Sequence, residues 1–167
     1  MDQTPRFALP FLAPGQAQKE WFVNESLQII DMLLCPVVEA PPLNNPPAGA
    51  VPGQCFAVGD APAGDWAGRG GSIAGFSGGG WRFVVTPEGA RLLIRSTGET
   101  VVRRDGAWET GVVRARQVQV DGRAVLGSRQ PSIQAPAGGL VVDAEARSAI
   151  STVIAAMQAH GLIETQD

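Results

Sequence analysis

The chain has 167 residues, 44% of them hydrophobic, which is enough for one compact domain or two small modules. Its net charge of −3 argues against general nucleic-acid binding, because contact with a phosphate backbone needs a strongly basic surface. The sequence shows no apolar run of bilayer length, and its acidic start at Asp2 is unlike a secretory signal. We therefore expect no nucleic-acid partner and no membrane insertion.

Glycine (21 residues) and proline (13 residues) are both frequent, which favours short strands and tight turns over a helical bundle. The expected fold class is α+β, with an N-terminal helix, a small antiparallel β-domain of short strands, and a C-terminal β-hairpin plus helix. Cys35 and Cys55 lack metal-site spacing and fit free thiols in a protein assembled in the bacterial cytoplasm.

Residues 1–35 are predicted to form an N-terminal arm followed by a helix. Three prolines within the first 15 residues keep the arm extended. The arm is apolar, so it must dock either on its own domain or on a neighbour. Between residues 16 and 34, Val23, Leu27, Ile30 and Leu34 recur at the spacing of one helix face, and Pro36 ends the helix.

Residues 36–53 are rich in proline and read as a linker or a long surface connection. A small β-domain is predicted over 54–110, with strands at 54–58, 72–76, 81–86, 90–96 and 100–104. The glycine runs and polar turns between these segments fit hairpin connections.

Residues 111–167 are predicted to form a hairpin and a C-terminal helix. Asp121-Gly122 is a strong hairpin signal between strands at 116–120 and 123–126. Asp143 suits a helix N-cap, and Gly161 suits the left-handed position after the last turn near His160. The apolar stripe of this helix packs on its own domain or forms a subunit interface; it comprises Ala146, Ile150, Val153, Ile154 and Met157.

Charge is unevenly distributed along the chain. Residues 1–65 carry seven acids and two bases, whereas residues 91–129 carry eight arginines and four acids. The arginine excess fits either a solvated strand face with ion pairs or a polar contact surface for an acidic partner protein.

Three tryptophans, Trp66, Trp81 and Trp108, each follow a glycine- or aspartate-containing turn. Such a residue can begin a strand and cover a small core. Alternatively, its exposed indole can stack on a sugar ring, which makes these three residues candidate glycan-stacking positions.

A catalytic constellation is not evident in the sequence. His160 is the one histidine, and it falls at the end of a predicted helix, where a cation is structurally favourable. No His/Cys cluster suggests a metal, and the glycine-rich run at 68–80 lacks the Lys-Ser/Thr of a phosphate loop. We expect no enzyme activity, no cofactor and no metal, although a hydrolase with paired carboxylates stays open because such pairs meet only in the fold.

Two separated stretches resemble an uncharacterised family found among tail, fibre and spike proteins of alphaproteobacterial phages and gene transfer agents. The first comprises Leu9 and Pro10, the run PGQAQKE at 14–20, Asn24 and Glu25, and Leu27. The second comprises RQP at 129–131, Gly138 and Gly139, and VDAEAR at 142–147. Within that group the chain is most similar to head spike base proteins of gene transfer agents.

This resemblance implies a virion component that attaches a receptor-binding fibre to the capsid and so serves host-cell attachment. It implies three partners: other copies of the chain, a capsid protein, and a spike or fibre protein; contact with surface polysaccharide would be indirect. A seat at a capsid vertex would impose a five-fold ring. The alternatives are a carbohydrate-binding module or a tail-fibre component. Candidate assembly contacts are Phe7, Leu9, Phe11, Leu12, Trp21, Ile150, Ile154 and Met157.

Overall fold

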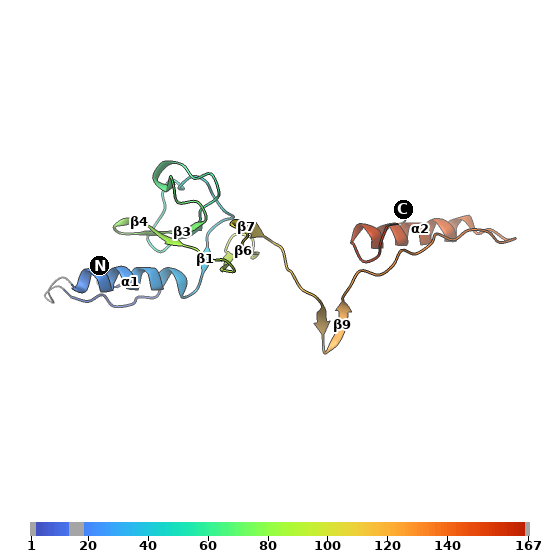
Figure 1. Cartoon of the computed structure of the whole chain (residues 1–167), viewed down its shortest axis with the longest axis horizontal. Helices are drawn as coiled ribbons and strands as arrows, with labels where there is room; N and C mark the ends of the chain where they lie inside the picture. Colours follow the sequence, from blue (N-terminus) through green and yellow to red (C-terminus); the bar gives the residue numbers. More distant parts are fainter. Residues whose placement is uncertain (1–2, 14–18, 166–167) are drawn as a thin grey trace. The chain divides into compact units, whose positions relative to one another are not determined.

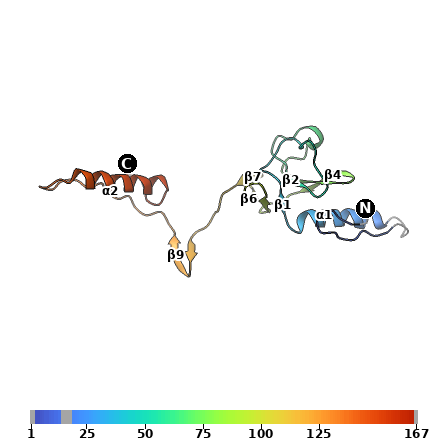
Figure 2. The ribbon, with the colours of Figure 1, turned by 180° about the vertical axis from the view of Figure 1, so that it is seen from behind.

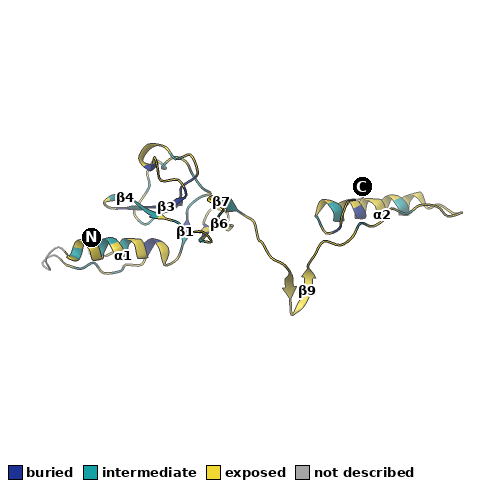
Figure 3. Ribbon diagram, in the orientation of Figure 1, coloured by how far each residue is buried: buried dark blue, intermediate teal, exposed yellow. Residues whose placement is uncertain are grey.

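The computed structural model describes residues 3–13 and 19–165 and has the expected α+β class. The chain divides into two compact units, Met1–Val113 (unit 1) and Arg114–Asp167 (unit 2), which are described separately. Unit 1 holds helix α1 (Lys19–Leu33) and seven strands, whereas unit 2 holds one hairpin and helix α2 (Ala144–Ala159) (Figure 1). Buried residues concentrate in unit 1, and most of the ribbon of unit 2 is exposed (Figure 3).

Two small sheets make up the β-domain of unit 1. One sheet has the order β1-β5-β6-β7, in which β1 runs parallel to β5 and the other pairs are antiparallel. The other sheet is the antiparallel meander β2-β3-β4. The strands are β1 (Val37–Val38), β2 (Cys55–Ala57), β3 (Ser72–Ser77), β4 (Gly80–Val85), β5 (Arg91–Ile94), β6 (Thr100–Arg104) and β7 (Ala107–Thr110). The five strands predicted between 54 and 104 are all present, and each bound lies within two residues of its prediction.

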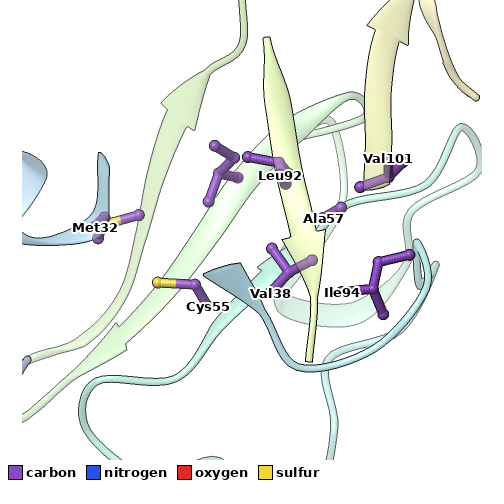
Figure 4. Packing of buried hydrophobic residues seen from close by; sticks show 8 residues of the cluster. Met32, Val38, Cys55, Ala57, Leu92, Ile94 and Val101 are labelled. Atoms are coloured by element: carbon purple, nitrogen blue, oxygen red, sulfur yellow. The ribbon is translucent and has the colours of Figure 1, made fainter. Parts of the chain in front are cut away.

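The main core lies between the two sheets and the end of α1. Successive residues of a strand point to opposite faces, so Cys55 and Ala57 of β2 enter this core while Phe56 points away. Figure 4 shows side chains from α1, β1, β2, β5 and β6 converging there. The cluster comprises Met32, Val38, Cys55, Ala57, Ile73, Leu92, Ile94 and Val101.

A second, aromatic cluster covers the other face of β2 and β3. Phe56, Val58 and Ala74 form it together with Trp66, which lies in the short 3-10 helix η1 (Gly64–Trp66). Because both of its faces are covered, β2 is buried along its whole length although it has only three residues.

Helix α1 lies along β3 and β4 in both views of the ribbon (Figure 1 and Figure 2). Met32 of this helix packs on Gly75 of β3, where a Cβ atom would lie 2.6 Å from the Sδ atom of Met32. A larger residue at this position would therefore displace the side chain of Met32, which is buried in the main core.

The proline-rich stretch 36–53, which we expected to be a linker, contributes to the β-domain. Val37 and Val38 form β1, whose partner β5 lies more than 50 residues further along the chain, and Val38 is buried. Leu43 also makes a parallel bridge to Val58. Val38 supplies the one buried side chain of this segment, whereas Val37 is half-buried and Val51 is exposed.

Unit 2 begins with the hairpin of β8 (Val118–Val120) and β9 (Arg123–Leu126). Asp121 and Gly122 both have positive φ, as the two-residue turn requires. In α2, the side chain of Asp143 accepts a hydrogen bond from the backbone N–H of Ala146, which confirms the predicted N-cap. At the other end Gly161 has φ +68°, and the N–H of Leu162 donates to the carbonyl of Met157, the expected Schellman arrangement.

Candidate functional site

The N-terminal arm docks on α1 of its own chain, through the buried carboxylate of Asp31. Thr4 Oγ1 donates to Asp31 Oδ1 over 2.6 Å, the N–H of Phe7 donates to the same oxygen over 2.7 Å, and the N–H of Arg6 donates to Oδ2 over 3.0 Å. Thr4 and Asp31 are both fully buried. Three donors thus compensate the loss of hydration of this carboxylate.

Arg6 and Asn24 add two further attachments for the arm. The Arg6 guanidinium donates to the carbonyls of Met32 (3.0 Å) and Cys35 (2.8 Å), which lack helical partners at the end of α1. Asn24 Oδ1 accepts from the N–H of Leu12, and Asn24 Nδ2 donates to its carbonyl. Of the predicted arm contacts, Phe7 is exposed, whereas Leu9, Phe11 and Leu12 are half-buried against the chain itself.

The outward side of α1 is apolar and exposed. Only Asp31 and Met32 of this helix are buried. On the face that the hydrophobic spacing predicted, Val23, Ile30 and Leu34 are exposed and Leu27 is half-buried, so this face points mainly to solvent. The exposed large residues on and beside α1 are Trp21, Phe22, Val23, Ile29, Ile30, Leu33 and Leu34. Of these, we expected only Trp21 to be an assembly contact. A second hydrophobic spacing along the helix, offset by one residue, was the signal for Phe22, Ile29 and Leu33.

Two of the three candidate sugar platforms, Trp66 and Trp81, belong to the aromatic cluster. Trp66 is 0% exposed, so neither face of its indole is open to a sugar ring. Its ring lies 5.1 Å from that of Trp81 and 6.0 Å from that of Phe56, and Phe76 also packs edge-on against Trp81 at 4.8 Å. Trp81 is half-buried by these neighbours.

The third tryptophan, Trp108, lies apart from the other two and packs against the main core. Its Nε1–H donates to the carbonyl of Val58 over 2.8 Å, and the Arg103 guanidinium lies over its ring at 5.4 Å. The structure therefore brings together Trp66 and Trp81 but not Trp108, and gives all three packing contacts.

The arginine-rich segment makes several ion pairs. Arg95 lies 3.2 Å from Glu39, Arg104 lies 3.3 Å from Glu109, and Arg103 lies 3.8 Å from Asp60. In addition, Arg82 of β4 pairs with Glu25 of α1 and so links the helix to the sheet. These contacts fit the reading of a solvated strand face with ion pairs.

Unit 2 exposes most of its apolar side chains. Every residue from 111 to 131 is exposed, and in the stripe of α2 only Ile154 is buried, while Met157 is half-buried and Ile150 is exposed. Leu140 and Val141 are almost completely exposed. An isolated two-stranded hairpin is marginally stable in water, so packing against other chains would stabilise this unit.

Residues of the second resembling stretch hold unit 2 together. The N–H of Gln130 donates to the carbonyl of Leu162 over 3.0 Å, and its carbonyl accepts from the N–H of Glu164 over 2.8 Å. Arg129 Nε donates to the carbonyl of Gly161 over 3.2 Å, and Arg147 donates to the carbonyl of Gly138. In the first stretch, Asn24 and Glu25 likewise make internal contacts. These quoted residues thus maintain the chain's own structure.

The reactive groups of the described residues are scattered. Within residues 3–13 and 19–165, no three His, Cys, Asp or Glu side chains are grouped as metal ligands. Burial raises the pKa of the Cys55 thiol above its usual 9.0, although the nearby Arg6 acts in the opposite direction, whereas Cys35 is exposed. His160 is exposed at the C-cap of α2. Neither described helix has the length and apolar content needed to cross a membrane.

Comparison with known proteins places the chain in a family of unknown function. Residues 23–109, about half of the chain, match the family described as "Protein of unknown function (DUF2793)". The chain belongs to this family. The matched segment covers most of α1, the strands β1 to β6, and all of β7 except Thr110. No curated protein matches the chain.

Proposed function

We propose that the chain is a structural protein of a phage-like particle, namely a head spike base that joins a receptor-binding fibre to the capsid of a gene transfer agent. Its work is binding: it assembles with copies of itself and with the capsid and fibre proteins. A seat at a capsid vertex makes a ring of five copies the natural symmetry. The particle is the chain's final location, after assembly in the bacterial cytoplasm.

The observation that carries this proposal is the exposure of unit 2. Among the described residues its hairpin pairs with no third strand, and residues 114–131 are all exposed. A hairpin of this kind becomes stable when further strands or helices cover its apolar side chains. Val118, Val120, Val125 and Leu126 are available for such contacts, as is Ile150 of α2. This is the surface expected of an assembly element.

The roles of the resembling residues give further support. Asn24, Glu25, Arg129, Gln130 and Arg147 bind the chain's own backbone or an internal partner. A signature of this kind maintains a particular fold, as an adaptor protein requires. The assignment of the chain to the head spike rests on its sequence resemblance to spike base proteins.

The deciding experiment is deletion of the gene in the source bacterium, followed by electron microscopy of its phage-like particles. We expect intact heads and tails that lack head spikes, and restoration of the spikes by the wild-type gene. Particles with unchanged head spikes would overturn the proposal. Loss of tail fibres with head spikes retained would place the protein in the tail and would equally overturn the spike-base assignment.

A further inference from the structure

Helix α1 carries an apolar surface on the side that faces solvent. We define the outward face of α1 as the residues Phe22, Val23, Ile29, Ile30, Leu33 and Leu34, which are between 38% and 70% exposed. Leu34 follows the last helical residue but still donates its N–H to the carbonyl of Ile30. The opposite side of α1 is fixed to unit 1 by Asp31 and Met32, so the outward face does not depend on a partner for its helical conformation.

The spacing of these residues is that of a helix that packs against other helices. Phe22 and Ile29 are seven residues apart, as are Val23 and Ile30, and Leu33 and Leu34 follow four residues later. Steps of seven and four place apolar side chains along one seam, as in coiled coils and helix bundles. Two adjacent rows make this seam wide enough to meet more than one neighbouring helix.

The side chains of the outward face are apolar, so a partner needs neither charged nor hydrogen-bonding groups to contact it. Its central polar residue, Ser26, donates its hydroxyl to the carbonyl of Phe22 over 2.9 Å. Of the charged residues of α1, Glu25 is paired with Arg82 and Asp31 is bound to the arm, away from this face. The exposed Lys19 lies one turn before Phe22 and Val23, at the N-terminal edge of the face. The chemistry that complements this face is therefore another apolar helical face, and Ser26 is small enough to let two backbones approach closely.

The size of the face also suits a specific contact. Six large side chains at this exposure present several hundred Å² of apolar surface, above what scattered surface residues provide, and Trp21 extends the patch at one end. A standard interface buries about 800 Å² on each partner. Because each copy brings the same patch, the outward face supplies several hundred Å² on each partner and forms the central part of an interface of this size.

We propose that the outward face of α1 is a helix–helix interface between copies of this chain. This inference rests on the homo-oligomeric assembly in the proposed function and specifies which surface of unit 1 takes part. The copies meet through Val23, Ile30 and Leu33, with Phe22 and Ile29 at the flank of the seam.

The test is the native mass of the full-length chain, measured by sedimentation velocity over a range of concentrations for wild type, Ile30→Glu and Phe22→Lys. Both substitutions place an unpaired charge on the outward face, while both positions are exposed in the single chain. The matched control is Val85→Glu, which changes an apolar residue that is 84% exposed at the end of β4. Circular dichroism spectra establish that each variant is folded.

We expect wild type and Val85→Glu to associate, and both α1 variants to require at least about tenfold higher concentration for the same association, since a buried unpaired charge costs more than 1.4 kcal/mol. If folded Ile30→Glu and Phe22→Lys associate like wild type, the α1 interface is wrong while the spike-base proposal stands. A monomeric wild type, or equal loss in the Val85→Glu control, would also overturn the α1 interface. The deletion experiment above decides the spike-base proposal independently.

Discussion

The hydroxyl of Thr4 donates a 2.6 Å hydrogen bond to the carboxylate of Asp31, 27 residues further along the chain, and both side chains are buried. This contact joins the N-terminal arm to the inward side of α1. The backbone N–H groups of Arg6 and Phe7 donate to the same carboxylate, so Asp31 binds three polar groups of the arm. Asp31 therefore holds the arm on α1 together with Arg6 and Asn24.

We expect Asp31→Asn to lower the free energy of unfolding by about 1–3 kcal/mol, the usual cost of leaving buried polar groups without partners. The substitution keeps the shape but replaces one accepting oxygen with an NH₂ group, which faces donors from the arm. Urea denaturation measures the loss, and amide hydrogen exchange at Arg6 and Phe7 locates it. Asp60→Asn is the control, because Asp60 is exposed and its ion pair with Arg103 is long, at 3.8 Å. Equal stability of the two variants would contradict the role of Asp31.

The contact between Gly75 and Met32 predicts a second effect on stability. A methyl group at position 75 would lie 2.6 Å from Met32 Sδ, so α1 must shift or Met32 must leave its rotamer. We expect Gly75→Ala to cost about 1–3 kcal/mol, as overpacked cores do. In contrast, Gly78→Ala meets no heavy atom within 4 Å and should change stability little. Thermal unfolding of both variants is the measurement; equal stability of Gly75→Ala and Gly78→Ala would contradict a tight contact between position 75 and Met32.

The raised pKa of Cys55 predicts how stability responds to alkaline pH. Burial favours the neutral thiol in the folded state, so the stabilisation is fully present below the usual pKa of 9.0 and is lost as the pH rises through the higher folded value. We expect Cys55→Ala to remove this part of the alkaline destabilisation, as measured by urea denaturation between neutral and alkaline pH. Iodoacetamide at neutral pH should modify exposed Cys35 and spare Cys55 until the protein unfolds. Rapid modification of both thiols in the native protein would be inconsistent with the buried position.

Local features were predictable from the sequence where neighbouring residues determine them. Asp143 and Gly161 define the two ends of α2 through hydrogen bonds within a few residues, and Asp121-Gly122 determines the hairpin turn. The α+β class likewise follows from turn residues and strand patterns. Each of these depends on backbone preferences of single residues, which sequence reveals directly.

The orientation of α1 and the place of β1 were not predictable in this way. Apolar spacing favours burying Val23 and Ile30, but the helix instead buries Asp31, because the arm supplies three donors for its carboxylate. Val38 lies in a proline-rich stretch, and its pairing partner Ile94 is 56 residues away. Both outcomes depend on contacts between distant segments, which periodicity within one segment does not contain.

The exposure of residues 111–131 predicts where proteases first cut the dissociated chain. Trypsin should cleave at Arg116 and Arg123, because cleavage needs an extended, exposed backbone that can open locally. Arg91 and Arg95 are the internal control: both are exposed, but Arg91 lies in β5 and the N–H of Arg95 donates to the carbonyl of Val38. We expect a resistant fragment that retains residues 23–109, identified by mass spectrometry at successive times. Early cleavage at Arg91 or Arg95 would instead show that the sheet β1-β5-β6-β7 opens more readily than the hairpin. Because assembly buries the hairpin in the proposed particle component, the rate of cleavage at Arg116 and Arg123 should fall as association increases.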